Sequence, residues 1–339
     1  MMSKGIDAIL VIHVSGRAGD TLFITPLLET IAKKYPKSKI TLLAHRNTVN
    51  LLENCKYTDC IGTISKKRAR YRGWNFIKKY NLAFVSSSPD EDADTLVSYA
   101  CRVSKEVVAF KPNANKLIKC LTKSVTKNFG ESRHIIDYYH DLTSSMGIDP
   151  MSKRIQYVSN NFELIASKKI LKGSGIAGCD FIVAVKITSL PSRSYRDWPD
   201  DHLVSLMKLL VDKYDNIGFV AFGGFSEYER YENIANKAKA KLLNLSDKSL
   251  REVGSMMQYV DVYIGVDTGV THLMSSFNTP MIVLYHPLAS KRQYAPLNHP
   301  YFFSFECDGN DSVETEELMS TISPNLVSDK VENILDNKL

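Results

Sequence analysis

The stretch that decides the fold is "AILVIHVSGRAGDTLFITPLLE", residues 8–29. It begins with apolar residues typical of a buried strand and continues through a glycine-containing turn into apolar residues at helical spacing. A strand that leads through such a turn into a helix is common in α/β proteins, and the turn often binds a phosphate. Here the predicted helix begins with Asp20, and the third glycine of a dinucleotide-binding fingerprint is missing. The turn therefore carries a negative charge where a phosphate-binding loop would be neutral.

The same alternation continues along the chain, which is typical of a parallel sheet covered by helices on both faces. We expect strands at Ala8–Val14, Lys39–Ala44, Asn81–Ser86, Phe181–Ile187, Gly218–Phe222, Val262–Gly265 and Met281–Tyr285. We expect helices at about Asp20–Tyr35, His202–Lys213, Tyr228–Ala240 and Val270–Phe277, and an amphipathic helix within 133–149 that ends at Gly147. The polar, lysine-rich segment from Asn113 to Phe129 is expected to be a mobile connection.

The pattern starts again near residue 170, where the glycine-rich segment "LKGSGIAGCD", residues 171–180, precedes a new apolar run. The chain has 339 residues, more than one hydrophobic core usually supports. We therefore predict a Rossmann-like domain over 1–168 and a second over 169–339. We also consider that the last helix packs back on the N-terminal domain.

The composition is that of an ordinary globular protein, with 44% hydrophobic and 24% charged residues. The net charge of +6 favours an anionic partner, such as a sugar phosphate, a nucleic acid or an acidic membrane surface. The six cysteines show no C-x-x-C spacing, which indicates reduced thiols in a cytosolic protein, without a disulfide framework or zinc site. No apolar stretch approaches the ~18 residues that a membrane span needs.

The most informative stretch is "YIGVDTGVTHLMSS", residues 263–276. A strand ends near Asp267, and Thr268-Gly269 turn the chain into a helix that carries His272. Free backbone N–H groups and the helix dipole favour an anion at such a helix start, and Asp267 can accept hydrogen bonds from sugar hydroxyls. A capping aspartate beside a core histidine would produce the same pattern, so the residues alone leave both interpretations open.

The next segment, "NTPMIVLYHPLASKRQYAP" (278–296), makes this half of the chain similar to glycosyltransferase family 9, the ADP-heptose:lipopolysaccharide heptosyltransferases. Gly19-Asp20-Thr21-Leu22 and the Thr-Pro-Leu that follows resemble the start of family members. "RDWPDDHLVSLMKLL" (196–210) resembles their basic–x–Trp-Pro helix start, and "FGGFSEYER" (222–230) their glycine-then-glutamate turn. The resemblance covers nearly the whole chain in order.

The resemblance implies an α/β, GT-B-type fold with two Rossmann-like domains that face each other across a cleft. The N-terminal domain would bind the acceptor and the C-terminal domain the nucleotide-sugar. The implied reaction is the inverting transfer of a heptose, or a related sugar, from ADP-heptose to a hydroxyl of a lipopolysaccharide or lipooligosaccharide core. It needs no metal or cofactor. We expect a cytoplasmic protein with peripheral contact with the inner membrane, and no nucleic-acid partner.

The resemblance also implies roles for individual residues. Asp20 would be the general base that deprotonates the acceptor hydroxyl. Arg196 would stabilise the departing diphosphate, and Glu227 would bind the ribose. Further donor-binding positions are Thr188, Ser189, Asp267, Thr268, Gly269 and His272. One departure is plain, because the family usually has a His-Pro or His-Ala pair where this chain has Lys186-Ile187-Thr188-Ser189.

The stretch "SKKRARYRGWNFIKKY", residues 65–80, has seven basic residues interleaved with aromatic ones. This composition suits nucleic-acid binding or a solvated basic helix. Family members have a similar arginine- and tryptophan-bearing loop that faces the anionic acceptor. The resemblance therefore assigns Arg68, Arg70 and Arg72 to acceptor binding, with Arg133 and His134 as the next candidates.

Other functions fit the sequence less well. "PDEDADTL", residues 89–96, contains the metal-binding D-x-D pattern of another glycosyltransferase fold, but acidic residues are also favoured at a helix start. A nicotinamide dehydrogenase is disfavoured because the glycine fingerprint is incomplete and the second strand ends in His45-Arg46 without an acid for the ribose. A sugar-nucleotide 2-epimerase with the same fold and a non-catalytic nucleotide-sugar-binding module remain as alternatives.

Overall fold

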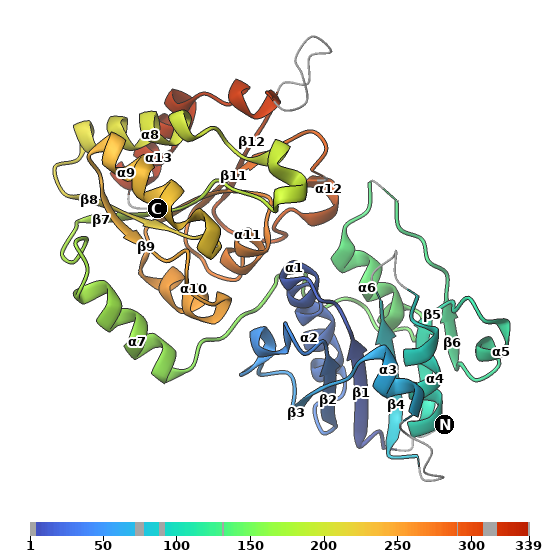
Figure 1. Cartoon of the computed structure of the whole chain (residues 1–339). Coiled ribbons are helices and arrows are strands. Elements are labelled where there is room, and N and C mark those ends of the chain that lie inside the picture. Colours follow the sequence, from blue (N-terminus) through green and yellow to red (C-terminus); the bar gives the residue numbers. More distant parts are fainter. Residues whose placement is uncertain are drawn as a thin grey trace. The chain divides into compact units, whose positions relative to one another are not determined.

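A computed structural model describes residues 5–71, 78–87, 92–130, 132–289, 291–307 and 317–337. The chain divides into two compact units, Met1–Val158 with Arg292–Leu297, and Ser159–Lys291 with Asn298–Leu339 (Figure 1). We expected the division at 168/169. It falls at 158/159 because helix α7 (Asn161–Lys172) packs on α10 (Leu250–Met256) of the second unit.

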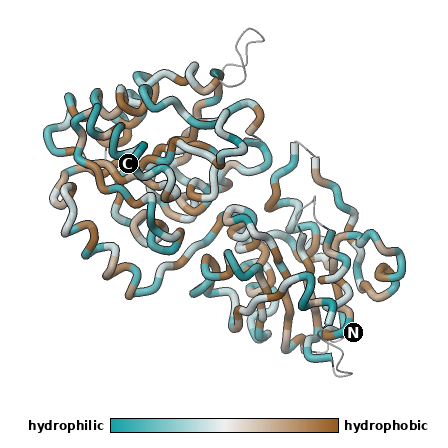
Figure 2. Tube along the Cα trace, viewed as in Figure 1, coloured by the Kyte–Doolittle hydropathy of each residue, from teal (hydrophilic) through white to brown (hydrophobic). Residues whose placement is uncertain are grey.

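The first unit contains a parallel sheet with the order β3-β2-β1-β4-β5-β6 among the described residues. Its strands are β1 (Ala8–His13), β2 (Lys39–Ala44), β3 (Cys60–Thr63), β4 (Tyr80–Ser86), β5 (Ser104–Phe110) and β6 (Lys123–Val125). Strands β1 and β4 lie in the middle of the sheet and are almost entirely buried. Figure 2 shows the corresponding concentration of hydrophobic residues along the central strands.

Helices cover both faces of this sheet. They are α1 (Ala18–Leu22), α2 (Thr25–Lys34), α3 (Lys66–Tyr71), α4 (Asp94–Val103), α5 (Asn115–Ile118) and α6 (Ile135–Ser144). Helix α4 packs with α3 and α5, whereas α6 packs with α2, and α4 and α6 each contact β5. The helices therefore form two separate layers (Figure 1). Helix α6 ends as expected before Gly147, whose φ of 71° suits a residue without a side chain.

The single helix expected over Asp20–Tyr35 is wrong, because the chain forms α1 and α2 with a break between them. Pro26 has no N–H to donate to the carbonyl oxygen of Leu22 four residues earlier. The hydroxyl of Thr25 donates to that oxygen instead, at 2.8 Å. The break leaves Asp20 on a short helix of its own.

The expectation of a mobile connection between residues 113 and 129 is also wrong. This segment contains α5 and β6, and β6 pairs in parallel with β5. Backbone hydrogen bonds from Thr122 to Val107 (2.8 Å) and from Lys111 to Val125 (2.7 Å) hold it in place. Lys123 lies exposed on the edge strand β6, where polar side chains are usual.

The second unit repeats the architecture, with the strand order β12-β11-β10-β7-β8-β9 in the described part of the chain. Its strands are β7 (Phe181–Lys186), β8 (Ile217–Ala221), β9 (Lys241–Asn244), β10 (Val262–Val266), β11 (Met281–Tyr285) and β12 (Phe302–Glu306). Besides α7 and α10, its helices are α8 (Asp200–Lys213), α9 (Tyr228–Ala238), α11 (Gly269–Met274), α12 (Lys291–Tyr294, partly in the first unit) and α13 (Pro324–Asp336).

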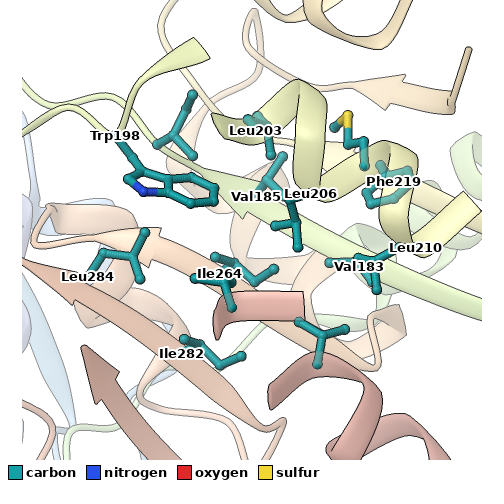
Figure 3. Close-up of a cluster of buried hydrophobic side chains, with 14 of the residues drawn as sticks. Val183, Val185, Trp198, Leu203, Leu206, Leu210, Phe219, Ile264, Ile282 and Leu284 are labelled. Carbon is teal, nitrogen blue, oxygen red and sulfur yellow. The ribbon is translucent and has the colours of Figure 1, made fainter. Parts of the chain in front are cut away.

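Trp198 anchors the core of the second unit (Figure 3). Its ring is fully buried, and its Nε1 donates to the carbonyl oxygen of Ile322 at 2.9 Å. Helix α13 packs on α8, where Lys213 pairs with Glu332 at 2.7 Å. The last helix, considered above for the N-terminal domain, thus belongs to the second unit. None of the helices in the described ranges is both long and apolar enough to cross a bilayer.

Candidate functional site

The first group of candidate residues surrounds Asp20 at the carboxyl end of β1. Asp20 is half-buried in the first turn of α1. The hydroxyl of Ser15 donates to its Oδ2 at 3.2 Å, whereas Oδ1 accepts no hydrogen bond from the described residues. One carboxylate oxygen is therefore held in place, and the other is available to accept a proton.

His13, the last residue of β1, holds this turn in place through hydrogen bonds of its ring. Its Nε2 donates to the backbone oxygen of Asp20 at 2.9 Å, and its Nδ1 accepts from the hydroxyl of Ser86 at 2.8 Å. Because a carbonyl oxygen only accepts, the proton lies on Nε2. Burial lowers the pKa of His13 to about 4, although Asp20 opposes the shift. In the sequence, the only sign of His13 is that a polar residue ends an apolar strand.

We expect His13→Gln to reduce the loss of stability on acidification. The pKa of His13 is about 4 in the fold, below its ordinary 6.5, so the unfolded chain binds more protons between these values. Stability from this group is complete above pH 6.5 and falls as the pH drops toward 4. Between pH 7 and 5, His13 alone lowers the free energy of unfolding of the wild type by about 2 kcal/mol. Urea unfolding of both proteins at the two pH values measures it, and equal losses would contradict the role of His13.

The second group lies at the carboxyl ends of β7 and β8 and centres on a buried ion pair. The Nζ of Lys186 is 3.1 Å and 3.2 Å from the carboxylate oxygens of Glu227, and it also contacts the hydroxyl of Thr188. Burial lowers the pKa of Lys186 against the influence of Glu227. Burial alone would raise the pKa of Glu227, but Lys186 and other hydrogen-bond donors leave it lowered. From the sequence, Lys186 stands out only as part of a departure from the family pattern, and it has no assigned role there because it ends an otherwise apolar strand.

The glycine turn after β8 fits tightly around Glu227. The backbone N–H of Gly224 donates to Oε2 of Glu227 at 2.5 Å. A Cβ on Gly223 would lie 2.8 Å from both Oε2 of Glu227 and the hydroxyl oxygen of Ser246, so a side chain there would displace the carboxylate. Nearby, the N–H of Ser189 donates to Asp197 at 2.6 Å. The structure thus places Thr188 and Ser189 after the carboxyl end of β7, and Glu227 after that of β8.

Arg196 and Asp267 form the third group. Nη1 of Arg196 lies 3.5 Å from Oδ2 of Asp267, and Nη2 donates to the carbonyl oxygen of Leu288 at 2.9 Å. The guanidinium is buried, yet its Nε has no hydrogen-bond partner in the part of the chain that the structure describes. A buried cation with an unused donor is costly by itself and would gain from an anionic ligand.

The helix start at Thr268 excludes Asp267 as the capping residue of α11. Thr268, not Asp267, is the capping residue of α11, and its side chain makes no capping hydrogen bond. Asp267 pairs with Arg196 instead and lies 3.6 Å from Nε2 of His272. The first backbone N–H groups of α11, beginning at Gly269, have no partner within the helix, because α11 starts there. Asp267 therefore lies close to both Arg196 and His272 beside this helix start.

The acceptor candidates differ in their surroundings. Arg68 and Arg70 are exposed on α3, whereas Arg72 lies outside the described residues. Arg133 forms an ion pair with Asp141. His134 is buried and uses both ring nitrogens, since Nδ1 accepts from the N–H of Ile136 and Nε2 donates to the carbonyl oxygen of Ala295. Only the α3 arginines are thus placed at an open surface.

In the described part of the D-x-D segment, Asp94 has a structural role. Asp90 lies outside the described residues. The two carboxylate oxygens of Asp94 accept hydrogen bonds from the backbone N–H groups of Asn113 and Ala114, both at 2.8 Å. Asp94 therefore holds the loop that follows β5.

Comparisons with known proteins find similarity in both sequence and structure. The model for glycosyltransferase family 9 (heptosyltransferase) matches residues 98–306, more than half of the chain. Lipopolysaccharide heptosyltransferase 3 of Escherichia coli (strain K12) is 20% identical over an alignment of 302 residues, and the match covers 79% of this chain and 79% of that protein.

Two solved structures are similar over nearly their whole length. The glycosyl transferase family 9 protein of Veillonella parvula DSM 2008 has a TM-score of 0.81 at 17% identity, and the ADP-heptose lps heptosyltransferase II of E. coli has 0.76 at 18%. Each comparison covers 98% of this chain and 99% of the other. The fold is therefore of the GT-B type, with two Rossmann-like domains.

Proposed function

Because the chain belongs to glycosyltransferase family 9, we propose that it transfers a heptose, or a related sugar, from ADP-heptose to a hydroxyl of a lipopolysaccharide or lipooligosaccharide core. The observation that carries the proposal is the buried Arg196–Asp267 pair beside the helix start at Thr268. The names of the relatives support the donor and the acceptor, since they include an ADP-heptose lps heptosyltransferase and a lipopolysaccharide heptosyltransferase.

In this proposal the second unit binds the donor. The diphosphate contacts Arg196 and the backbone N–H groups at Gly269, with the hydroxyl of Thr268 as a further donor. The ribose hydroxyls donate to Glu227, which Lys186 holds in place. As the sugar–phosphate bond breaks, negative charge grows on the diphosphate, and the fixed cation of Arg196 stabilises it more than it stabilises the bound donor.

In the same proposal Asp20 activates the acceptor. Its available Oδ1 takes the proton of the acceptor hydroxyl while the hydroxyl oxygen attacks the anomeric carbon. Attack opposite the leaving diphosphate inverts the configuration at that carbon. The acid formed on Asp20 then passes its proton to solvent, which restores the carboxylate for the next turnover.

The direct test measures release of ADP from ADP-heptose with and without a core acceptor that lacks the terminal heptose. We expect release only with the acceptor, together with a product heavier by one heptose. Formation of an epimerised sugar without acceptor would favour the 2-epimerase alternative. Binding of ADP in titration calorimetry, without turnover on any of several nucleotide-sugars, would favour a non-catalytic binding module.

We further propose that α3 and the residues that follow it bind the anionic acceptor beside the membrane surface. Arg68 and Arg70 are exposed on α3, and five more basic residues lie within 65–80. Each cation near an acidic membrane surface adds about 1 kcal/mol of attraction, and salt screens such contacts. The charge density of this surface suits an acceptor with several phosphates or carboxylates.

Replacing Arg68, Arg70 and Arg72 with alanine should raise the acceptor KM roughly tenfold or more and leave the donor KM nearly unchanged, because three attractive charges are lost on the acceptor side only. The salt dependence of the acceptor KM should become shallower. A matched control removes three exposed lysines of α7 (Lys168, Lys169 and Lys172) from the second unit. Equal acceptor kinetics in both triple variants would mean that α3 is only a solvated basic helix.

A further inference from the structure

The described cysteines include two whose sulfur atoms are in contact. Cys101 lies in the last turn of α4, and Cys120 lies just after α5, before β6. Their Sγ atoms are 2.7 Å apart, and Cys120 also donates to the carbonyl oxygen of Leu117 at 2.9 Å. A disulfide bond is about 2.05 Å long, so the sulfurs would have to approach by only about 0.7 Å. Both thiols are reduced in the structure.

Both sulfurs are also open to reagents. Cys120 is exposed and Cys101 is half-buried, and the side chains come from segments 19 positions apart in the sequence. The glycosyl-transfer mechanism proposed above uses neither residue. A single exposed cysteine elsewhere in the same unit, Cys60, offers a natural comparison because no contact with a second sulfur is found for it in the described ranges.

We propose that Cys101 and Cys120 form a dithiol site that is oxidised reversibly to an intramolecular disulfide by exchange with a low-molecular-weight disulfide such as oxidised glutathione. This inference does not depend on the proposed transferase activity. The bond would join the end of α4 to the turn before β6 and so close a loop that contains β5 and α5.

The exchange proceeds in two balanced steps. The thiolate of the exposed Cys120 attacks one sulfur of the small disulfide, which forms a mixed disulfide and releases one small thiolate. Cys101 then loses its proton to solvent and attacks Sγ of Cys120, which releases the second small thiolate. Both small thiolates take up protons from solvent. The net change is the loss of two hydrogen atoms from the protein and their gain by the small disulfide, which becomes two thiols.

The surroundings of the two sulfurs support this order. Burial raises the pKa of Cys101 to about 12, and the neighbouring sulfur of Cys120 adds to the shift. Cys101 is therefore a poor first nucleophile. The charges of Lys78 and Arg102 oppose the shift. Once the sulfur of Cys120 is in a mixed disulfide, it can no longer carry a negative charge, and the two cations then favour the thiolate of Cys101.

The test uses the full-length reduced protein in glutathione buffers of defined ratio, with acid quenching and intact-mass measurement. We expect the wild type to lose about 2 Da, reversibly with dithiothreitol, and peptide mapping to link the segments that contain residues 101 and 120. The oxidised protein should unfold at a temperature at least ~5 °C higher, because the closed loop restricts the unfolded chain.

Three variants make the result decisive. Cys101→Ser should accumulate one glutathione on Cys120, because the resolving thiol is gone, whereas Cys120→Ser should react much more slowly. Cys60→Ser should behave like the wild type. The proposal fails if the wild type keeps two free thiols at residues 101 and 120 in oxidised glutathione. It also fails if the linked peptides contain other cysteines, or if Cys101→Ser gains no adduct.

Discussion

Replacing Asp20 with asparagine will lower kcat by roughly 10²–10⁴-fold, the usual effect of removing a general base, and will leave the affinity for ADP nearly unchanged. The amide keeps the size of the side chain and can still accept the hydrogen bond from Ser15, but it cannot take up the proton of the acceptor. The two constants are measured by steady-state assay of ADP release and by titration calorimetry with ADP. The family match, residues 98–306, does not include Asp20, so this experiment tests a role that the match leaves open.

Two control variants distinguish a loss of catalysis from a loss of stability or local structure. Asp94→Asn changes another aspartate in the first turn of a helix of the same unit, one that holds backbone N–H groups, and should affect stability but not kcat. Ser15→Ala removes the hydrogen bond to Oδ2 and keeps the carboxylate, so its effect on kcat should be much smaller than that of Asp20→Asn. An Asp20→Asn enzyme whose rate stays within about tenfold of the wild type would exclude Asp20 as the base, since tenfold is only ~1.4 kcal/mol.

The sequence predicted the centre of each sheet well and its edges poorly. Strands β1, β4, β7, β10 and β11 are apolar and buried on both faces, which produces a continuous hydrophobic run. Four of the five unpredicted strands, β3, β6, β9 and β12, are the edge strands of the two sheets, and most of their residues are partly exposed. The fifth, β5, lies inside the first sheet, but it follows α4 directly and Lys105 and Glu106 interrupt its apolar pattern. An edge strand faces solvent along one side, so its sequence lacks the strong apolar signal.

The residues of the candidate site also fall into those that the sequence predicted and those that it did not. Asp20, Arg196 and Asp267 stand in short motifs next to turns, and the order of these motifs along the chain made them candidates. Lys186 and His13 could not be found like this, because each is a single polar residue at the end of a buried strand. Their roles depend on partners far away in the sequence, Glu227 for Lys186 and Ser86 for His13. The register of β1 and β4 pairs His13 with Ser86, and the turn after β8 brings Glu227 to Lys186.

Replacing Arg196 with glutamine will lower kcat/KM for the donor by roughly 10²–10³-fold, the loss typical of removing one donor from a site where charge develops. The guanidinium is buried, pairs with Asp267 at 3.5 Å, and has an Nε without a partner among the residues described. The leaving diphosphate gains negative charge in the transition state, and a neutral amide stabilises that charge far less than a cation. Steady-state kinetics at varied donor concentration measure the change. Arg196→Lys should recover part of the rate, because it restores the charge without the planar group that also binds the carbonyl oxygen of Leu288.

The control for Arg196 is Arg251→Gln. Arg251 is also a buried arginine of the second unit, and its partner is Glu163 on α7. Removing either arginine leaves a carboxylate without its cation, so both variants should lose stability by amounts of similar size. Only the change at Arg196 should alter the kinetics for the donor, because Arg251 lies in the contact between α7 and α10. If both variants retain the wild-type donor kinetics, the diphosphate does not depend on Arg196. The backbone N–H groups at Gly269 would then have to stabilise the leaving group without it.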